Sequence, residues 1–427
     1  MKVLIVGGGG REHAIVKALG KNERIKKIFV TPANGGIMKE NVQCVNFKTT
    51  DVSAITDFVI ECEIDYIIVA PEDPLSLGMV DALEKKGRKC FGPNQAAARI
   101  ESSKIFSKNL MKKYGIPTAN FQTFSNSQEA VNHVSLSSIK FPLVIKADGL
   151  ALGKGVIIAE NRDEALAAIN SIMTEKKFGE NGANIVIEDF LTGPEVTILA
   201  FTDGKTIKPM ISSMDHKRAL DGNKGLNTGG MGVIAPNPHY TNEIAAVCEE
   251  TIFKRTIAAM QSEGCPFKGC LYFGLILTPT GPMVIEYNCR FGDPEAQAVL
   301  SLLETDLFDI MEAVTDERLH EIDIKWSSNY AACVILASGG YPESYKTGLT
   351  INGLNPDGGA SALGSDTVIY HSGTEFTFSG TFRTTGGRVL GVCATDISLH
   401  MALEKAYKTA SIINFDGMHY RKDIGSY

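Results

Sequence analysis

Short apolar runs alternate with amphipathic segments over about the first 100 positions of the chain. The apolar runs have the length of buried strands, whereas the segments between them space their apolar residues as helices do. A strand–helix order repeated in this way predicts a parallel sheet wound by helices. We expect strands at residues 3–6, 28–30, 66–70 and 90–92 and helices at residues 11–19, 53–61 and 80–86.

Glycines at residues 7–10 follow the first expected strand and open the first expected helix. Backbone amides at a helix start can bind an anion. A dinucleotide site is disfavoured, because Glu12 or His13 replaces the third glycine of the fingerprint and the second strand ends without an acidic residue. The pattern favours another phosphate-bearing ligand. The turns at residues 34–36 and 71–74 lie where such sheets bind ligands, with plain turns as the alternative.

A glycine-rich segment, residues 148–155, joins two expected strands at residues 143–147 and 156–159. A Walker loop would have a longer glycine spacing, a Ser or Thr after its lysine and a following helix, so P-loop chemistry is excluded. We predict instead a flexible hairpin that closes over phosphates and excludes water. Lys146 lies in an apolar run and needs an anionic partner there. Lys154 lies at the tip of the hairpin, with a solvated surface lysine as the alternative.

Two further strands, at residues 185–191 and 196–201, flank a Gly-Pro turn. The backbone of residues 188–191 is expected to pair with an adenine edge, and Glu195 is expected to bind ribose hydroxyls. A strand followed by such a turn is common, so this assignment depends on the rest of the site.

Residues 215–232 are rich in glycine and in charges of both signs, and we expect no regular element there. A loop of this length is usually functional or disordered, and we favour function. His216 has catalytic potential, but its neighbours are cations, so we do not assign it as a base. The elements expected after this loop are a helix at residues 242–261, strands at 270–277 and 282–288, and a helix at 294–303.

Strict alternation in the last of these strands places Val284, Glu286 and Asn288 on one face. Two positions along a strand are roughly 7 Å apart, so Glu286 and Asn288 can share the hard cations that Mg²⁺ sites hold when phosphates complete the shell. Arg290 and the turn at residues 291–295 add a cation and two carboxylates. This stretch predicts a reaction centre, with an edge strand and a solvated polar face as the alternative.

The final part of the chain contains an apolar strand at residues 331–337, several β-rich pieces at 360–393 and one amphipathic helix at 399–413. Residues 315–328 are a plausible linker before it. We expect a compact α+β cap without obvious chemistry. The predicted architecture is multidomain, α/β and α+β, with domains at residues 1–101, 102–327 (including a mobile lid at about 118–191) and 328–427.

Composition restricts the function further. The chain has 427 residues and a net charge of −7, and its Lys and Arg residues are scattered. The composition therefore does not indicate a basic surface that binds nucleic acid. Its nine cysteines form an odd, dispersed set, which is typical of reduced thiols in a cytoplasmic protein. No apolar run has the length of a secretory signal or of a membrane span, so we expect neither.

Together these features describe an ATP site that is neither of the kinase nor of the Walker type. A carboxylate resists attack by an amine, but transfer of the γ-phosphoryl group onto it makes a mixed anhydride that an amine can open. Positioning and charge neutralisation would supply most of that catalysis. Lys146 would spread the phosphate charge, and Arg290 would steady the acyl-phosphate oxygen.

Several motifs resemble phosphoribosylamine–glycine ligases (glycinamide ribonucleotide synthetases), which are ATP-grasp enzymes of purine biosynthesis. The resemblance implies ATP, glycine and 5-phosphoribosylamine as substrates, glycyl phosphate as intermediate, and Mg²⁺ or Mn²⁺. The motifs are GGGGREHA (7–14), ESSK (101–104), IKADGLALGKGV (145–156), DHKRALDGNKGLNTGGMG (215–232), RFGDPEAQ (290–297), GGRVLGV (386–392) and YRKDIG (420–425).

Residue roles follow from the same resemblance. Glu286 and Asn288 are the expected metal ligands, and Arg290, Asp215 and Lys146 are the expected catalytic residues. The expected ATP contacts are Lys104, Lys146, Gly153, Lys154, Gly155, Glu188, Asp189, Phe190, Leu191 and Glu195. The expected contacts to the amine substrate or glycine are Gly9, Gly10, Asp215, Arg290, Asp293 and Pro294.

The chain departs from the family pattern at a few positions, which are Ala33, Asp73, Ala296 and Ala298. Ala33 matters most, because the family usually has glycine there and a left-handed backbone would be unfavourable for alanine. The main rival interpretation is an ATP-dependent ligase that uses formate or bicarbonate. A nucleotide-sensing protein without catalysis and an oxidoreductase are weaker alternatives. The oligomeric state is left open between monomer and homodimer.

Overall fold

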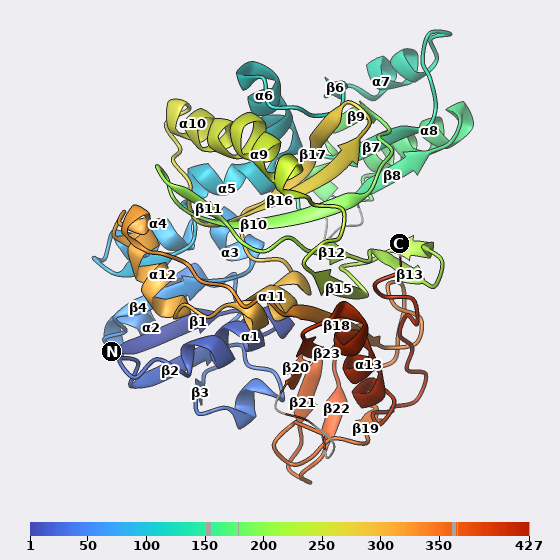
Figure 1. Ribbon diagram of the computed structural model, residues 1–427. Coiled ribbons are helices and arrows are strands. Elements are labelled where there is room, and N and C mark those ends of the chain that lie inside the picture. The colour runs from blue at the N-terminus through green and yellow to red at the C-terminus, as the bar shows by residue number, and fades with distance from the viewer. Residues whose placement is uncertain (151–154, 178, 361–363, 365, 427) are drawn as a thin grey trace.

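The computed structural model describes residues 1–150, 155–177, 179–360, 364 and 366–426. Figure 1 shows a blue N-terminal layer, a body of antiparallel sheets above it and a red C-terminal region beside it. No helix among the described residues is long and apolar enough to cross a membrane.

The N-terminal sheet is parallel throughout, with strand order β3-β2-β1-β4-β5. Every strand and helix that the sequence predicts here is confirmed, and β3 and α3 are additional. Residues 71–74 are no plain turn, because α3 begins at Glu72. The elements are β1 (Lys2–Val6), α1 (Gly10–Leu19), β2 (Lys27–Thr31), β3 (Gln43–Cys44), α2 (Val52–Glu61), β4 (Tyr66–Val69), α3 (Glu72–Ser76), α4 (Met79–Glu84) and β5 (Lys89–Phe91).

Two helices connect this layer to the next, α5 (Gln95–Ser102) and α6 (Lys104–Tyr114). Ser103 separates them, and its hydroxyl caps α6 by accepting a hydrogen bond from the Phe106 amide at 3.1 Å. The ESSK motif therefore spans a break between two helices, and not a helix start alone.

A four-stranded antiparallel sheet with order β6-β9-β7-β8 forms the lid region. Its strands are β6 (Phe121–Phe124), β7 (Leu143–Ala147), β8 (Val156–Ala159) and β9 (Ile185–Asp189), and helices α7 (Ser127–Val134) and α8 (Arg162–Ile169) accompany it. β7 pairs with β8 so that Lys146 lies opposite Val156, which confirms the predicted hairpin. Gly153 and Lys154 lie outside the described residues.

The second antiparallel sheet has the order β11-β10-β16-β17, so β17 is an edge strand. A π-helical turn joins α9 and α10, which confirms the long helix predicted there. The elements are β10 (Glu195–Asp203), β11 (Ile207–Pro209), α9 (Asn242–Cys248), α10 (Lys254–Ser262), β16 (Lys268–Thr278), β17 (Gly281–Asn288), α11 (Glu295–Val299) and α12 (Leu307–Thr315).

The C-terminal sheet, β12-β15-β18-β23-β20, draws strands from two distant parts of the chain. β18 lies at its centre because residues 331–337 are all apolar and buried. The elements of this region are β12 (Met214–Asp215), β13 (Arg218–Leu220), β14 (Lys224–Asn227), β15 (Gly232–Ala235), β18 (Tyr330–Ala337), β19 (Thr350–Ile351), β20 (Thr367–His371), β21 (Thr374–Phe376), β22 (Phe382–Thr384), β23 (Arg388–Asp396) and α13 (Leu399–Ala410).

The expectation that residues 215–232 lack regular structure is wrong. They contain the hairpin β13–β14, and β12 and β15 join the C-terminal sheet beside β18. Short strands interrupted by glycine have no apolar alternation, so their pattern resembles that of a loop. The segment thereby ties the middle of the chain to its C-terminal region.

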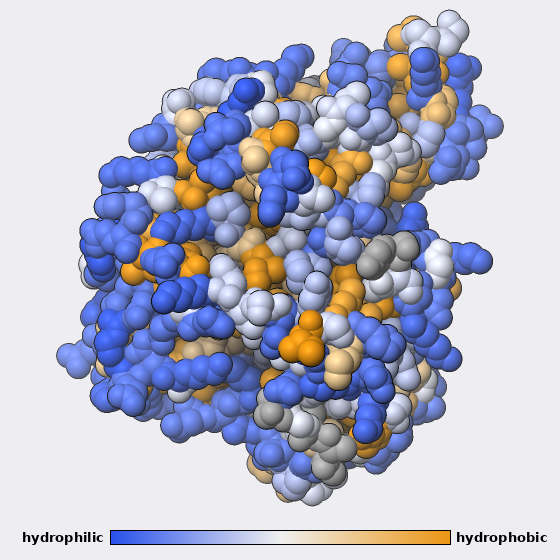
Figure 2. Space-filling model, in the orientation of Figure 1, coloured by the Kyte–Doolittle hydropathy of each residue, from blue (hydrophilic) through white to orange (hydrophobic). Residues whose placement is uncertain are grey.

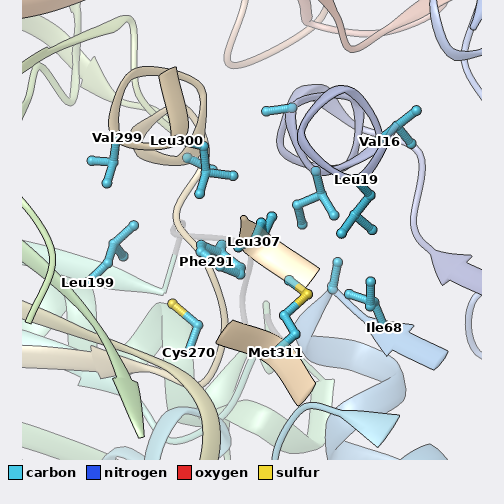
Figure 3. Close-up of a cluster of buried hydrophobic side chains, with 14 of the residues drawn as sticks. Val16, Leu19, Ile68, Leu199, Cys270, Phe291, Val299, Leu300, Leu307 and Met311 are labelled. Atoms are coloured by element: carbon cyan, nitrogen blue, oxygen red, sulfur yellow. The ribbon is translucent and has the colours of Figure 1, made fainter. Parts of the chain in front are cut away.

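One buried cluster connects all three parts of the molecule. Figure 3 shows side chains from α1, β4 and α12 facing those from β10, β16 and the segment after β17. Because this core is continuous, the N-terminal layer and the β16–β17 hairpin hold fixed positions relative to each other. The labelled residues are Val16, Leu19, Ile68, Leu199, Cys270, Phe291, Val299, Leu300, Leu307 and Met311.

Candidate active site

The metal-site strand carries a β-bulge that the sequence does not reveal. Gly274 of β16 faces Glu286, but the next residue, Leu275, faces Val284. Ile285 is therefore the extra residue of β17, and the register shifts there.

The bulge corrects the predicted strand faces. Val284 and Tyr287 both lie in the hydrophobic core, although strict alternation would separate them. Glu286 and Asn288 share the other face, as predicted, but Val284 does not share it with them. Without the bulge, Val284 would share a face with Glu286 and Asn288. Either Val284 would then leave the core or the two polar side chains would enter it.

Glu286 is surrounded by cations. Lys217 Nζ lies 3.6 Å from its Oε1 and 3.4 Å from Glu195 Oε2. Burial acts to raise the pKa of Glu286, but Lys217, Lys104 and Lys146 outweigh it and lower that pKa to about 2. The side chain remains 24% exposed, so an ionised carboxylate is accessible to a ligand. The structure therefore argues against the alternative interpretation, in which the polar face of this strand is only solvated.

Asn288 has a neighbour that orients its amide. With the nitrogen turned toward Glu101, it donates to Glu101 Oε1 and to the Tyr287 carbonyl, both at 3.1 Å. The Asn288 Oδ1 atom then points away from both acceptors and can serve as a ligand. Among the described residues no group of three or more His, Cys, Asp or Glu side chains forms a metal site. Two oxygen donors beside each other fit a Mg²⁺ ion whose remaining ligands are phosphates and water.

A buried charged triad lies across from this strand. Glu188 forms ion pairs with both Lys146 and Lys108. Lys146 Nζ also donates to the Ile285 carbonyl at 3.1 Å, which links the lid sheet to the bulge of β17. The prediction that Lys146 needs an anionic partner is confirmed. Because Glu188 is that partner, its side chain is already engaged.

Lys108 is a site residue that the sequence analysis missed. It lies on α6, and its Nζ donates to the Thr118 hydroxyl at 2.8 Å. Burial, together with repulsion from Lys146, lowers the Lys108 pKa to about 8, although Glu188 acts to raise it. The triad of two lysines and one carboxylate leaves a positive charge when all three are ionised, which favours an anion nearby. A lysine on the buried face of a predicted helix is the signal that would have identified it.

Four further predicted ATP contacts lie where the chain passes from the lid sheet to the second antiparallel sheet. β9 ends at Asp189, and Phe190 and Leu191 follow it toward Glu195 at the start of β10. Asp189 accepts a hydrogen bond from the Asn120 side chain at 2.9 Å. Figure 2 shows a notch in the molecular outline between the lobe that carries α7 and α8 and the body below it.

Lys104 and Gly155 are held close to the same region. Lys104 Nζ donates to the Glu101 carbonyl at 3.1 Å and contributes to the low pKa of Glu286. The Gly155 carbonyl accepts from the Ala147 amide at 2.8 Å and so closes the base of the hairpin.

Arg290 is fixed between two carboxylates. Its Nε donates to Glu72 and its Nη2 donates to Glu101, each at 3.1 Å. These partners raise the Arg290 pKa well above its ordinary value, despite burial. The turn predicted at residues 71–74 and the ESSK motif thus meet the RFGDPE motif. The guanidinium is rigidly placed, with donors left over for a ligand.

The Oδ1 atom of the partly buried Asp215 is itself buried and receives no hydrogen bond from any described residue. Burial and the nearby Glu295 raise its pKa well above the ordinary value. A Cβ atom built on Gly230 would lie 2.6 Å from Asp215 Oδ1 and 2.5 Å from Pro294 Cδ. Gly230 has φ +113°, so glycine is needed there both for space and for its backbone conformation.

The glycines of the first turn approach the same place from the N-terminal layer. A Cβ atom on Gly9 would lie 3.4 Å from Asp293 Oδ2, and one on Gly10 would lie 2.5 Å from Gln297 Nε2. Gln297 Nε2 donates to Asp293 Oδ1 at 2.7 Å. The structure therefore brings the predicted substrate residues Gly9, Gly10, Asp293, Pro294 and Asp215 together.

The C-terminal region, in which we expected no obvious chemistry, places one side chain beside the predicted substrate residues. Arg388, from the GGRVLGV motif, reaches Asp293, with Nη2 3.4 Å from Oδ2. The Arg388 guanidinium also donates to the Gly229 carbonyl at 2.5 Å. Its sequence motif gave no indication of this contact, because the motif is otherwise an apolar strand.

Ala33 does not adopt the left-handed backbone that would be unfavourable for alanine. The described non-glycine residues with positive φ are Glu63, Lys176, Asn223 and Glu317. The adjacent Asn34 sets the turn instead, since its Oδ1 accepts from the amides of Gly36 and Ile37, each at 2.9 Å. Alanine is therefore compatible with this turn.

Comparison with known proteins gives matches along almost the entire chain. The models for the N domain, the ATP-grasp (A) domain and the C domain of phosphoribosylglycinamide synthetase match residues 1–101, 102–296 and 331–427.

Individual proteins give the same result. The chain is 44% identical over 426 residues to phosphoribosylamine–glycine ligase of Caldanaerobacter subterraneus subsp. tengcongensis, covering 100% of both sequences. It is 43% identical over 425 residues to the ligase of that name from Clostridium acetobutylicum, covering 100% of this chain and 99% of the relative. The crystal structure of phosphoribosylamine–glycine ligase from Thermotoga maritima superposes with a TM-score of 0.84 at 30% identity, covering 99% of this chain and 100% of that one.

Proposed function

This chain belongs to the phosphoribosylglycinamide synthetase family, and we propose that it joins glycine to 5-phosphoribosylamine. The reaction consumes ATP and yields glycinamide ribonucleotide, ADP and phosphate, as a step of de novo purine biosynthesis. The single observation that carries this proposal is the pairing of two oppositely charged surfaces. The Lys146–Glu188–Lys108 triad faces the ionised Glu286, and a triphosphate with its cation complements both.

Glu286 and Asn288 would hold Mg²⁺ or Mn²⁺. The low pKa of Glu286 and the oriented Asn288 amide support this assignment. When bound, the cation neutralises phosphate charge and orients the terminal phosphoryl group. Lys217, which lies between Glu286 and Glu195, keeps Glu286 ionised in its absence.

The nucleotide lies between the lid sheet and the β16–β17 hairpin in this proposal. Lys146 and Lys104 bind phosphate oxygens, and Gly155 closes the base of the β7–β8 hairpin beside them. The backbone from Asp189 through Phe190 to Leu191 pairs with the adenine edge, and Glu195 binds the ribose. The engagement of Glu188 with two lysines supports a positioning role for its side chain, because it fixes Lys146.

The reaction proceeds in two transfers. A carboxylate oxygen of glycine attacks the γ-phosphorus, the bond to the β-phosphate oxygen breaks, and ADP leaves with that electron pair. The phosphoribosylamine nitrogen then attacks the carbonyl carbon, loses a proton, and inorganic phosphate leaves with the former carboxylate oxygen. Arg290 stabilises charge on the acyl-phosphate oxygens, held in place by Glu72 and Glu101.

The two other substrates lie on the far side of Glu286. Gly10 offers a backbone amide at the start of α1 for the sugar phosphate, whereas the Gly9 amide already donates to Glu12 Oε2 at 2.6 Å. Asp215, Asp293 and Pro294 line the adjoining pocket for the amino groups. The unsatisfied Asp215 Oδ1 supports this placement, because a ligand donor would satisfy it.

The wider assignments are also proposals. We propose domain boundaries at residues 1–101, 102–327 with a lid at about 118–191, and 328–427. The matched N-domain and C-domain segments, at residues 1–101 and 331–427, support the first boundary and the start of the last domain. We further propose that the protein acts in the cytoplasm as a monomer or homodimer.

Omission of single substrates tests the function. Phosphate release should require glycine and phosphoribosylamine together, and glycinamide ribonucleotide should appear with equal stoichiometry. Formate and bicarbonate serve as matched carboxylate controls and should give no turnover. ADP formation with formate in place of glycine would overturn the proposal.

A further inference from the structure

The Arg388 side chain, at the start of β23, contacts two other segments of the chain. Its Nη1 donates to the Gly229 carbonyl at 2.5 Å and to the Asp293 carbonyl, and its Nη2 lies 3.4 Å from Asp293 Oδ2. The side chain is only 20% exposed. Asp293, Asp215 and Glu295 are nearby anions that keep the Arg388 pKa raised, despite burial.

The carbonyl that Arg388 binds belongs to a loop beside the predicted substrate residues. Gly229 is followed by Gly230, whose left-handed backbone passes against Asp215 and Pro294. A second C-terminal side chain holds the same loop, because the Gly229 amide donates to the Tyr341 hydroxyl at 3.0 Å. The C-terminal region thus binds both polar groups of one glycine.

The carboxylate that Arg388 faces belongs to the opposite wall. Asp293 also accepts from Gln297, and Gly9 and Gly10 pack beside these two side chains. A single guanidinium therefore bonds both to the loop at 229–230 and to the turn at Asp293. A lysine has a point charge and cannot span two carbonyls and a carboxylate with a planar fork.

We propose that Arg388 is a positioning residue that sets the distance between the two walls of the amine and glycine pocket. This inference rests on the proposed function of that pocket. Arg388 touches neither the lid sheet nor the Glu286 strand in any recorded contact among the described residues. Its loss should therefore affect the amine substrate and glycine and leave ATP binding as it is.

The test compares steady-state constants of Arg388→Ala, Arg388→Lys and Tyr341→Phe with those of the parent. For Arg388→Ala, the KM for phosphoribosylamine should rise about 10- to 100-fold, which is the effect of a misplacement on the order of 1 Å. The KM for ATP should stay within about twofold. Added guanidinium should restore part of the loss in Arg388→Ala and none in Arg388→Lys, and Tyr341→Phe should show a smaller rise in the same KM.

The exposed Arg383 of β22 provides the matched control, and Arg383→Ala should leave all three KM values unchanged. Equal loss for all substrates without guanidinium rescue would overturn the proposal and make Arg388 purely structural. An unchanged KM for phosphoribosylamine in both Arg388→Ala and Tyr341→Phe would also overturn it. The proposed function is tested separately with the parent enzyme. If the parent shows no glycine-dependent turnover, that function is refuted before any variant is compared.

Discussion

Glu188 shows how a single buried side chain can determine the state of its surroundings. Its carboxylate is the shared partner of Lys108 and Lys146, and all three side chains are almost fully buried. Lysines in such a place remain charged only while an anion faces them. The residue therefore matters both for stability and for the positive surface that a phosphate would meet.

Replacement of Glu188 by Gln should destabilise the protein strongly, because two buried cations would then lack their anion. We expect a loss of about 3 kcal/mol in the free energy of unfolding, typical for a broken buried pair. Urea unfolding measures it. Glu317→Gln is the matched control, because Glu317 also binds two lysines, Lys205 and Lys268, but on the surface. That change should cost at most about 1 kcal/mol, and similar losses in both variants would contradict our account of the triad.

The sequence identifies residues that stand out within their own segment. Lys146 in an apolar run and Glu286 two positions from Asn288 could be predicted in this way. Lys108 and Arg388 could not, because their importance arises from contacts with residues far along the chain. Glu101 could be predicted only in part. Its motif was recognised, but the hydrogen bonds that it accepts from Arg290 and Cys289 could not be predicted.

At the scale of elements, the bulge of β17 decides which side chains reach the site. It keeps Val284 and Tyr287 in the core while Glu286 and Asn288 face the lid sheet. Gly274 lies opposite Glu286, and a Cβ atom there would be 3.1 Å from Glu286 Cγ. The register thus leaves just enough room for the Glu286 side chain.

Gly274→Ala should displace the Glu286 side chain without removing any charged group. We expect Mn²⁺ binding in the presence of ATP to weaken by about 10-fold, the lower range for disturbed support of a metal ligand. Paramagnetic resonance of free Mn²⁺ measures this affinity. The thermal midpoint of unfolding should change little, because the neighbouring side chain can give way. Unaltered Mn²⁺ affinity in a folded variant would contradict the claim that Gly274 leaves the space in which Glu286 binds the metal.

Elements with clear periodicity were predicted well, and those without it were not. The parallel sheet and the β7–β8 hairpin follow from apolar runs separated by turns. The β13–β14 hairpin was missed because glycine and charged residues obscure its alternation. The bulge was missed because a single inserted residue leaves no signature in composition.

At the scale of the whole molecule, buried histidines at the region boundaries should make stability depend on pH. Burial, with repulsion from Arg421, lowers the His216 pKa to about 4, and burial, with repulsion from His13, lowers the His371 pKa to about 3. Both remain neutral in the folded protein below pH 6.5, whereas the unfolded chain takes up protons there. The unfolded state is therefore favoured increasingly as pH falls from about 6.5 toward 4.

Urea unfolding between pH 7.5 and pH 4.5 measures this dependence. His371→Gln, which keeps a donor for the Gly358 carbonyl, should flatten the slope over that interval. Carboxylates such as Glu40 and Glu72, with pKa values of about 2, act in a lower window, from about 4.5 down to 2. An identical slope in the parent and in His371→Gln would show that His371 does not contribute.

The convergence of three chain regions on the predicted substrate residues explains why this site is only partly visible in the sequence. Gly9 and Gly10 come from the first region, Asp293 from the second and Arg388 from the third. Each motif can be recognised separately, but their mutual distances are set by the shared core in Figure 3.

Oxygen-isotope transfer tests the proposed chemistry most directly. Glycine labelled with ¹⁸O in both carboxylate oxygens is turned over with ATP and phosphoribosylamine, and the released phosphate is analysed by mass spectrometry. If the γ-phosphoryl group is transferred to the glycine carboxylate, each phosphate should carry one ¹⁸O atom and the amide product should retain the other. Phosphate without ¹⁸O would contradict the account, because ATP would then be cleaved by water and not by the carboxylate.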